Sequence, residues 1–406
     1  MKKLLALVLV AMMCLAFVAC EKAPETIDIN SVEDVKFGLI CLHDENSTYD
    51  KNFIEAFKEA VANLGLKDDQ WVIKTNIPEG NECYDAAVEL AEDGCNIIFA
   101  NSFGHESYIL QAAKEYPAVQ FCHATGTMAH TEKLDNFANA FASIYEGRYL
   151  AGVAAGMKLV ELYGDKDGKV SDENAKIGYV GAFPYAEVIS GYTSFYLGAK
   201  SIVENATMEV RYTNSWYDEA AEKTTALALI DNGCKLISQH ADSWGAPTAC
   251  EEKNIPNVSY NGSTEEKCPN TFIIASRINW APYFEYIIDC VQNDKAIDTD
   301  WTGTIATGSV EITALGGAAT AGTQEKLDEV KKGFQDGTIK VFDCSTFTVE
   351  GKPLTSFIAD VDDAGDFIPE TEVVETANGI TFVNESAKRS APYFNVIIDG
   401  ITAITE

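Results

Sequence analysis

The sequence predicts an α/β protein of two lobes, each a doubly wound parallel sheet with helices on both faces. Short apolar runs alternate with segments of helical periodicity, which is typical of a parallel sheet covered by helices. Runs such as KFGLICL at residues 36–42 and NIIFAN at 96–101 are almost continuously apolar, as strands buried on both faces must be. The alternation occurs twice, before and after residues 149–162, so we expect two lobes joined by a hinge.

The first series contains a helix at residues 50–64, where Phe53, Phe57, Ala60 and Leu64 recur at helical spacing. The other elements expected in this series are strands at 36–42, 71–75, 96–100 and 119–123 and helices at 84–91 and 107–115. The second series has strands at 177–180, 206–212, 236–239 and 257–260 and helices at 186–203, 220–232 and 246–252.

We expect the chain to cross between the lobes near residues 143–149, 276–280 and 302–310. The first lobe then comprises residues 35–146 and about 279–301, and the second comprises 147–278 and about 302–406.

The first residues have the pattern of an export signal. Lys2 and Lys3 precede an apolar run at residues 4–17, which is too short to span a bilayer comfortably. The run ends in small residues before Cys20, and this resembles the bacterial lipoprotein signal, in which that cysteine becomes the first residue and carries lipid. We therefore expect a signal peptide at 1–19 and a polar tether at 20–34. A plain secretory signal with an incidental cysteine is the alternative.

Composition argues against several classes of partner and site. The chain has 62 acidic and 30 basic residues and a net charge of −32, so it is poorly suited to nucleic acid or to an anionic lipid surface. The 11 cysteines form no C-x-x-C pair, and the five histidines form no metal-binding pair. Residues 360–366 begin like a calcium loop but lack its ligands, and we interpret them as an acidic turn. We expect no metal and no cofactor.

Polar and aromatic residues gather after the predicted strands, where ligands bind in open α/β sheets. The first-lobe candidates are Asp44, Tyr49, Asp50, Phe103, Gly104 and Thr125. The second-lobe candidates are Trp216, His240, Asp242, Ser243 and Gly262. A planar polar ligand, stacked by rings and held by carboxylate and amide groups, fits this set. His240 near Asp242 also permits acid–base chemistry, but no accompanying nucleophile or metal is in view.

Three segments carry a family resemblance. VKFGLICLHDENSTYDKNFIEAFKEA at residues 35–60, YEGRYLAGVAAGM at 145–157 and KIGYVGAFP at 176–184 resemble the basic membrane protein family of lipoproteins, substrate-binding proteins of ABC importers related to the purine nucleoside receptor. Residues 216–218, 239–243 and Gly262 resemble the branch thought to take purine bases or nucleosides. The resemblance covers roughly residues 35–342, and the tail after Asp343 matches poorly.

The resemblance implies a type I periplasmic-binding-protein-like fold and roles for particular residues. Asp44 would hydrogen-bond the base, Phe53 would stack on it, and Trp244 would supply the opposing ring. Relatives that bind nucleosides hold the ribose with an acidic residue and a lysine. The corresponding stretch here, residues 276–282 with Trp280, lacks that carboxylate, which favours a free base or a differently held nucleoside.

The function that follows is a non-catalytic receptor. We expect a monomeric lipoprotein, anchored through Cys20 on the extracytoplasmic face of the membrane, that closes on a purine by hinge motion and then docks on an ABC permease. A receptor for a signalling partner is the alternative. A nucleoside hydrolase is a third reading, for which Asp44 and Asp50 supply too few calcium ligands.

Overall fold

The computed structural model describes residues 31–361 and 368–404. The expected signal peptide, Cys20, most of the expected tether and residues 362–366 of the expected acidic turn lie outside these ranges. Within them, every helix is too short or too polar to span a bilayer.

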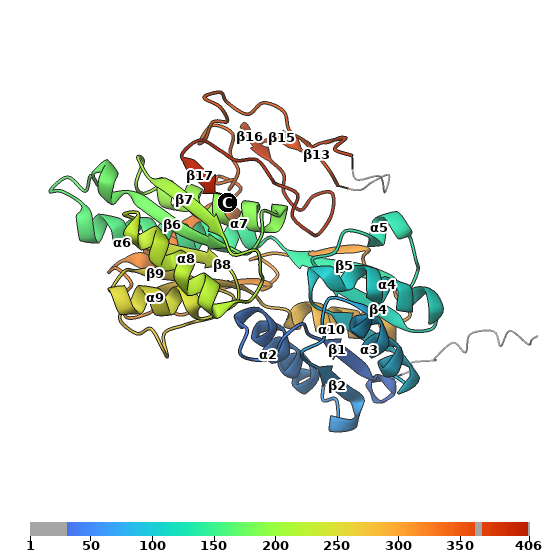
Figure 1. Ribbon diagram of the computed structural model, residues 1–406. Coiled ribbons are helices and arrows are strands. Elements are labelled where there is room, and N and C mark those ends of the chain that lie inside the picture. The colour runs from blue at the N-terminus through green and yellow to red at the C-terminus, as the bar shows by residue number, and fades with distance from the viewer. Residues whose placement is uncertain (1–30, 362–367, 405–406) are drawn as a thin grey trace, which may run out of the picture.

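The predicted fold class is confirmed, because two sheets with helices on both faces form two lobes (Figure 1). The first sheet is parallel throughout, in the order β11-β5-β4-β3-β1-β2. Its strands are β1 (Phe37–Ile40), β2 (Trp71–Lys74), β3 (Ile97–Ala100), β4 (Gln120–Ala124), β5 (Phe137–Ala142) and β11 (Asp300–Gly303). One face packs against α2 (Thr48–Asn63) and α10 (Ala281–Gln292), and the other against α3 (Asn81–Glu92) and α4 (Glu106–Glu115).

The second sheet has the order β12-β10-β9-β8-β6-β7-β17, and only β12 runs antiparallel to its neighbour. Its strands are β6 (Lys176–Gly181), β7 (Thr207–Tyr212), β8 (Leu236–His240), β9 (Asn257–Tyr260), β10 (Phe272–Ile278), β12 (Val310–Ile312) and β17 (Ile401–Ile404). Helices α6 (Ile144–Tyr163), α7 (Ala186–Lys200) and α11 (Thr323–Gln335) contribute to the core on one face, and α8 (Glu219–Asp231) and α9 (Gly245–Lys253) cover the other.

Glycines allow α6 and α7 to pack unusually closely. A Cβ on Gly152 would lie 1.9 Å from the carbonyl oxygen of Phe195, and one on Gly198 would lie 2.0 Å from that of Tyr149. Only glycine permits such an approach of the two backbones. This contact explains Gly152 in the segment YEGRYLAGVAAGM.

The chain passes between the two sheets three times: from β5 to α6, from β10 to α10 and from β11 to β12. The carboxyl ends of the parallel strands in both sheets face the space between the lobes. Loops that follow β1, β3, β4, β8 and β9 therefore meet there.

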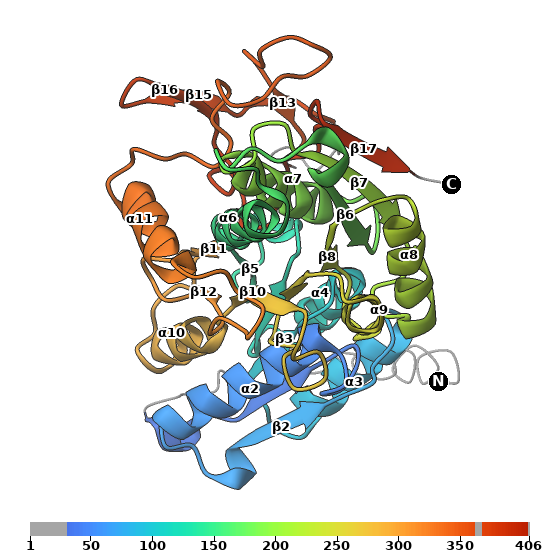
Figure 2. The ribbon, with the colours of Figure 1, turned by 90° about the vertical axis from the view of Figure 1, so that its left-hand side faces the viewer.

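The C-terminal segment packs on the second lobe (Figure 2). Strand β17 pairs with β7 at the edge of the sheet. Before it come two small antiparallel pairs, β13 (Ile358–Ala359) with β14 (Thr371–Glu372) and β15 (Val374–Ala377) with β16 (Ile380–Val383). Asn378 and Gly379 turn the second pair with φ of 53° and 80°, the left-handed values that favour Asn-Gly in tight hairpins.

Candidate functional site

A small cavity between the lobes is lined by residues from both. Leu42, Tyr49, Ser102, Phe103 and Thr125 come from the first lobe, and Glu187, Trp216, His240, Asp242 and Tyr260 from the second. Most of them follow the carboxyl end of a strand, where an open sheet leaves room for a ligand.

Tyr49 lies in the first turn of α2 and is oriented by a neighbouring strand end. Its hydroxyl donates a hydrogen bond to the carbonyl of Asn101, at 2.6 Å. Its ring contacts Phe53, with the ring centroids 4.9 Å apart. The phenol is therefore held in place before any ligand enters.

Thr125 is the strained residue of the first-lobe wall. Its φ is 67°, a left-handed value that a β-branched residue rarely adopts. Its hydroxyl is buried and has no hydrogen-bond partner. The following loop is fixed by the buried carboxylate of Glu106, which accepts the amides of Thr127 and Met128. A strained residue with an unsatisfied hydroxyl at a cavity wall is a candidate for ligand contact.

The second-lobe side of the cavity contains two aromatic rings in contact and a neighbouring carboxylate. The rings of His240 and Tyr260 lie 4.3 Å apart. His240 Nε2 lies 3.3 Å from Glu187 Oε1, and His240 Nδ1 has no partner. Burial lowers the pKa of His240, so the imidazole is neutral near pH 7.

Carboxyl groups give this wall its electrostatic character. Burial raises the pKa of Asp242 well above its usual range, and the charges of Asp50, Glu222 and Glu187 raise it further. Below the wall, Glu222 accepts the amide of Ser243, at 3.1 and 3.2 Å. Burial raises the pKa of Glu222 to about 7. The segment that carries Asp242 is thus fixed by a second buried acid.

A fully buried arginine contacts Tyr260. Arg148 donates to neutral groups, among them the hydroxyls of Tyr179 at 3.0 Å and Ser238 at 2.7 Å. Its guanidinium carbon lies 5.3 Å from the centre of the Tyr260 ring, a cation–π distance. This contact helps to hold the Tyr260 ring in place at the cavity wall.

The two lobes touch at the mouth of the cavity. The amide and hydroxyl of Thr48 donate to the carbonyl of Asp242, at 2.9 and 3.1 Å. The rings of Phe103 and Tyr185 lie 5.7 Å apart across the cleft. The structure therefore represents a closed arrangement of the lobes.

Several expected ligand residues lie elsewhere, which corrects the idea of a base stacked between Phe53 and Trp244. Phe53 is fully buried in the first-lobe core, where it stacks on Trp280 at 4.4 Å, so neither ring offers a face to a ligand. Trp244 begins α9, and its ring contacts the ammonium of Lys267 at 4.3 Å. Aromatic spacing on α2 did not distinguish a core position from a cavity position.

Other expected residues support the wall or local turns without lining the cavity. Asp44 accepts the amide of Asn46, and this bond is the main reason that its pKa is lowered. Asp50 is buried and accepts from Asn101. The hydroxyl of Ser243 accepts the amide of Gly245, Gly104 donates its amide to Glu79, and Gly262 has open space around it. Tyr49, Phe103, Thr125, Trp216, His240 and Asp242 are the expected residues that the structure brings together at the cavity.

The sequence reasoning missed four lining residues: Leu42, Ser102, Glu187 and Tyr260. Glu187 lies in the first turn of α7, after β6. The position of Glu187 after a parallel strand is the signal that could have identified it from the sequence.

The wall chemistry suits a planar ligand with hydrogen-bond donors. Tyr49, Phe103, Trp216 and Tyr260 supply rings, while Glu187 and Asp242 supply carboxyl groups. In the ranges 31–361 and 368–404, no three histidine, cysteine, aspartate or glutamate side chains gather as they would around a metal ion.

Comparison with known proteins gives a family match over most of the chain. Residues 37–341 match the Bmp family model, which describes PnrA-like substrate-binding proteins of ABC transporters. A purine-binding protein of Brucella abortus is 33% identical over 255 residues, which is 62% of this chain and 67% of that protein. The nucleoside-binding protein BmpA of Lactococcus lactis, described as an ABC transporter component, is 25% identical, over 56% of this chain and 61% of its own.

Another relative has a different ligand in its name. A putative ABC transporter glucose-binding protein of Haloferax volcanii is 31% identical, over 53% of this chain and 51% of that protein. The chain thus spans between about half and two thirds of the length of these relatives.

Solved structures share the fold. A solute-binding protein of an ABC transporter from Conexibacter woesei aligns with a TM-score of 0.60 at 18% identity, over 75% of this chain and 98% of that chain. One from Aeropyrum pernix aligns with a TM-score of 0.62 at 15% identity, over 76% and 93%. At these identities the likeness establishes the fold alone.

Proposed function

Because the chain belongs to the Bmp family of PnrA-like ABC transporter substrate-binding proteins, we propose that it captures a purine base or purine nucleoside between its lobes and delivers it to a permease. The observation that carries the proposal is the cavity, where both lobes contribute an aromatic ring and the second lobe contributes carboxyl groups. A purine is planar and presents N–H donors along its edge, so rings can stack on its faces while Glu187 and Asp242 accept from its edge.

Closure of the lobes supplies the mechanism. In an open protein, each wall would contact only one side of the ligand. Closure brings the first-lobe rings of Tyr49 and Phe103 toward Trp216 and Tyr260, and it excludes water from the hydrogen bonds to Thr125 and Asp242. The Thr48–Asp242 hydrogen bonds belong to the closed form. The permease would recognise this form.

The names of the relatives support the ligand class without deciding it. Two of them are described by purine or nucleoside binding and one by glucose binding. A sugar commonly stacks on aromatic rings too, but it needs many separate hydroxyl partners. The cavity is lined by rings from both lobes, such as Tyr49 and Trp216, which suit the two flat faces of a base, and this favours a purine.

A ligand panel tests this function. Purified protein should gain thermal stability with purine bases or nucleosides, because a ligand at 100 times its Kd stabilises by about 2.7 kcal/mol. Pyrimidines and glucose serve as controls. Stabilisation by glucose alone, or by none of these compounds, would contradict the proposal. Chromatography of an incubated nucleoside should recover it intact, since a receptor does not turn over its ligand.

We further propose that lipid on Cys20 anchors the receptor beside its permease. An anchor raises the effective concentration of the receptor at the membrane, and stable anchoring takes two acyl chains. Cys20→Ser should release the protein from membranes while ligand affinity stays unchanged. If the variant still sediments with membranes, the anchor lies elsewhere.

A further inference from the structure

The C-terminal extension lies beyond the part of the chain that matches the family model, and the structure describes its residues 343–361 and 368–404. It is firmly attached to the second lobe. Strand β17 extends the sheet beside β7, and Val361, Val373 and Phe394 join the second-lobe core. The hydroxyl of Tyr145, just after the first crossing, also donates to the carbonyl of Glu385 at 3.4 Å.

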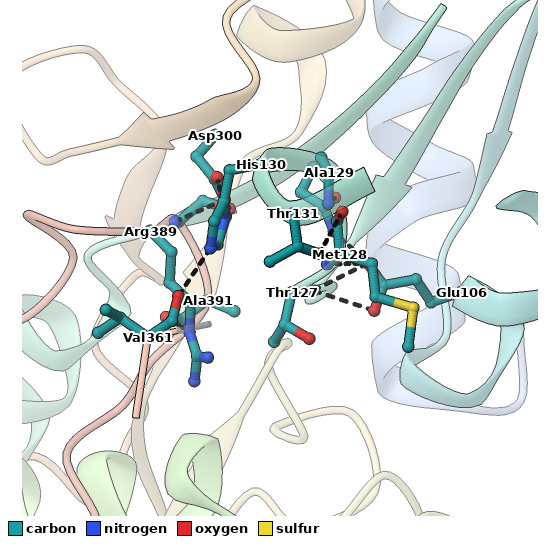
Figure 3. Close-up of polar contacts among 12 residues, drawn as sticks. Glu106, Thr127, Met128, Ala129, His130, Thr131, Asp300, Val361, Arg389 and Ala391 are labelled. Atoms are coloured by element: carbon teal, nitrogen blue, oxygen red, sulfur yellow. Dashed lines mark hydrogen bonds and ion pairs between the residues drawn. The ribbon is translucent and has the colours of Figure 1, made fainter. Parts of the chain in front are cut away.

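The same extension also binds the first lobe (Figure 3). His130, on the short helix α5 (Ala129–Glu132), places Nε2 2.7 Å from the carbonyl oxygen of Val361. Asp300, on β11, accepts the amide of Ser390 at 3.0 Å and its hydroxyl at 2.9 Å through Oδ1. The other carboxylate oxygen of Asp300 lies 2.8 Å from His130 Nδ1. These three side chains join the extension to the outer edge of the first sheet.

Burial shows that these contacts form a packed joint. Val361 and Ser390 are 0% exposed, and the side chains of His130 and Asp300 are only 17% and 14% exposed. Arg389 shapes the loop that presents Ser390, because its guanidinium donates to the carbonyls of Ala391 and Pro392. Hydrogen bonds to a carboxylate in such a place are stronger than those at an exposed surface.

The contacts between the extension and the first lobe lie near the crossing from β11 to β12 but are not part of it. Asp300 lies three residues before Gly303, the last residue of β11 before the crossing to β12, or roughly 10 Å along an extended strand. His130 lies on a different element of the first lobe. Rotation of this lobe about the crossings therefore moves Asp300 and His130 relative to an extension fixed on the second lobe. Hydrogen bonds of 2.7–3.0 Å tolerate little of that movement.

We propose that the described parts of the extension, residues 343–361 and 368–404, act as a strap that holds the first lobe in the closed arrangement through Asp300 and His130, and thereby slows release of the ligand. The inference rests on the hinge closure proposed above. It adds a control on closure that the family-matching part of the chain does not contain. A ligand that binds only the closed form is held longer when that form is favoured before binding.

The test compares Ser390→Ala and Asp300→Ala, alone and together, with Ser356→Ala. Ser356 is the matched control, because its hydroxyl donates to the carboxylate of Glu372 at 2.5 Å within the extension itself. Circular dichroism and thermal unfolding establish that each variant folds. Small-angle scattering of the ligand-free proteins then reports how open the lobes are, and stopped-flow fluorescence with a bound purine reports release.

The double variant should have a larger radius of gyration than the control without ligand, and it should release a purine roughly 5- to 30-fold faster. Equal radii for the double variant and Ser356→Ala would overturn the strap, whether or not the chain binds a purine. A larger radius with an unchanged release rate would overturn its effect on the ligand. If the protein binds no purine, the proposed function is contradicted. The scattering comparison still tests the strap, because it is made on the ligand-free proteins.

Discussion

Glu222→Gln should stabilise the second lobe at neutral and alkaline pH and leave it unchanged at acid pH. Glu222 is fully buried on α8, and burial raises the pKa of its carboxyl from 4.5 to about 7. The native carboxyl thus holds its proton more tightly than the unfolded one. The protonated carboxyl therefore stabilises the fold fully at pH values below about 4.5. This stabilisation is lost as the pH rises through about 7.

The size of the change in the free energy of unfolding follows from the same pKa shift. A pKa raised from 4.5 to about 7 corresponds to a penalty of about 3 kcal/mol once the carboxyl is ionised in both states. Glutamine has nearly the same shape and keeps one oxygen that can accept the amide of Ser243. It cannot ionise, so the variant avoids the whole of this penalty; the hydrogen bonds that Ser243 and Asp218 make to the ionised carboxyl are already included in the shifted pKa.

Unfolding curves between pH 4 and pH 8.5, followed by tryptophan fluorescence, provide the assay. The free energy of unfolding of Glu222→Gln should exceed that of the wild type by about 3 kcal/mol at pH 8 and match it near pH 4. Glu219→Gln, on the exposed side of the same helix, is the control and should show no such trend. A difference that is constant with pH would refute the reasoning, because it would trace the change to packing and not to ionisation.

Three further predictions concern the cavity and its scaffold. Trp216→Ala should weaken purine binding by about 1–3 kcal/mol in calorimetry, since it removes a stacking face. Phe53→Ala should instead lower the free energy of unfolding by about 3–5 kcal/mol, because that ring lies in the core. If both variants lowered affinity equally and left stability unchanged, this assignment would be contradicted. Thr125→Gly should raise folding stability by about 1 kcal/mol by relieving the strained φ yet lower affinity, while Thr125→Ser keeps the hydroxyl and should bind like the wild type. Gly198→Ala should destabilise the protein by about 3 kcal/mol in denaturant titration, because its Cβ would meet the Tyr149 carbonyl oxygen at 2.0 Å; unchanged stability would mean that α6 and α7 can separate at little cost.

The fold class could be predicted because it depends on local periodicity. The apolar runs around β1, β3 and β8 report strands buried on both faces, and the segments between them report helices. The general place of the site was also predictable, since parallel strands direct the residues that follow them to one edge of each sheet. Tyr49, Thr125, Trp216 and Asp242 were reached in this way.

Which aromatic ring faces a cavity and which faces the core was decided only by tertiary packing. Phe53 and Tyr49 lie on the same helix, one turn apart, and both carry a ring that a purine could stack on. The approach of Trp280 from α10 encloses Phe53 and leaves Tyr49 at the wall. No local pattern carries this information, because the partner lies more than 200 residues away in the chain.

By itself, the sequence determined two α/β lobes and the strand ends that meet between them, because hydrophobic periodicity and chain direction are local properties. Only the tertiary structure decided that Glu187 joins the wall, that Arg148 packs against Tyr260, and that the C-terminal extension returns to the first lobe through Ser390 and Val361. These features depend on which distant surfaces come together, and the free energy of such contacts appears only when both partners are in place.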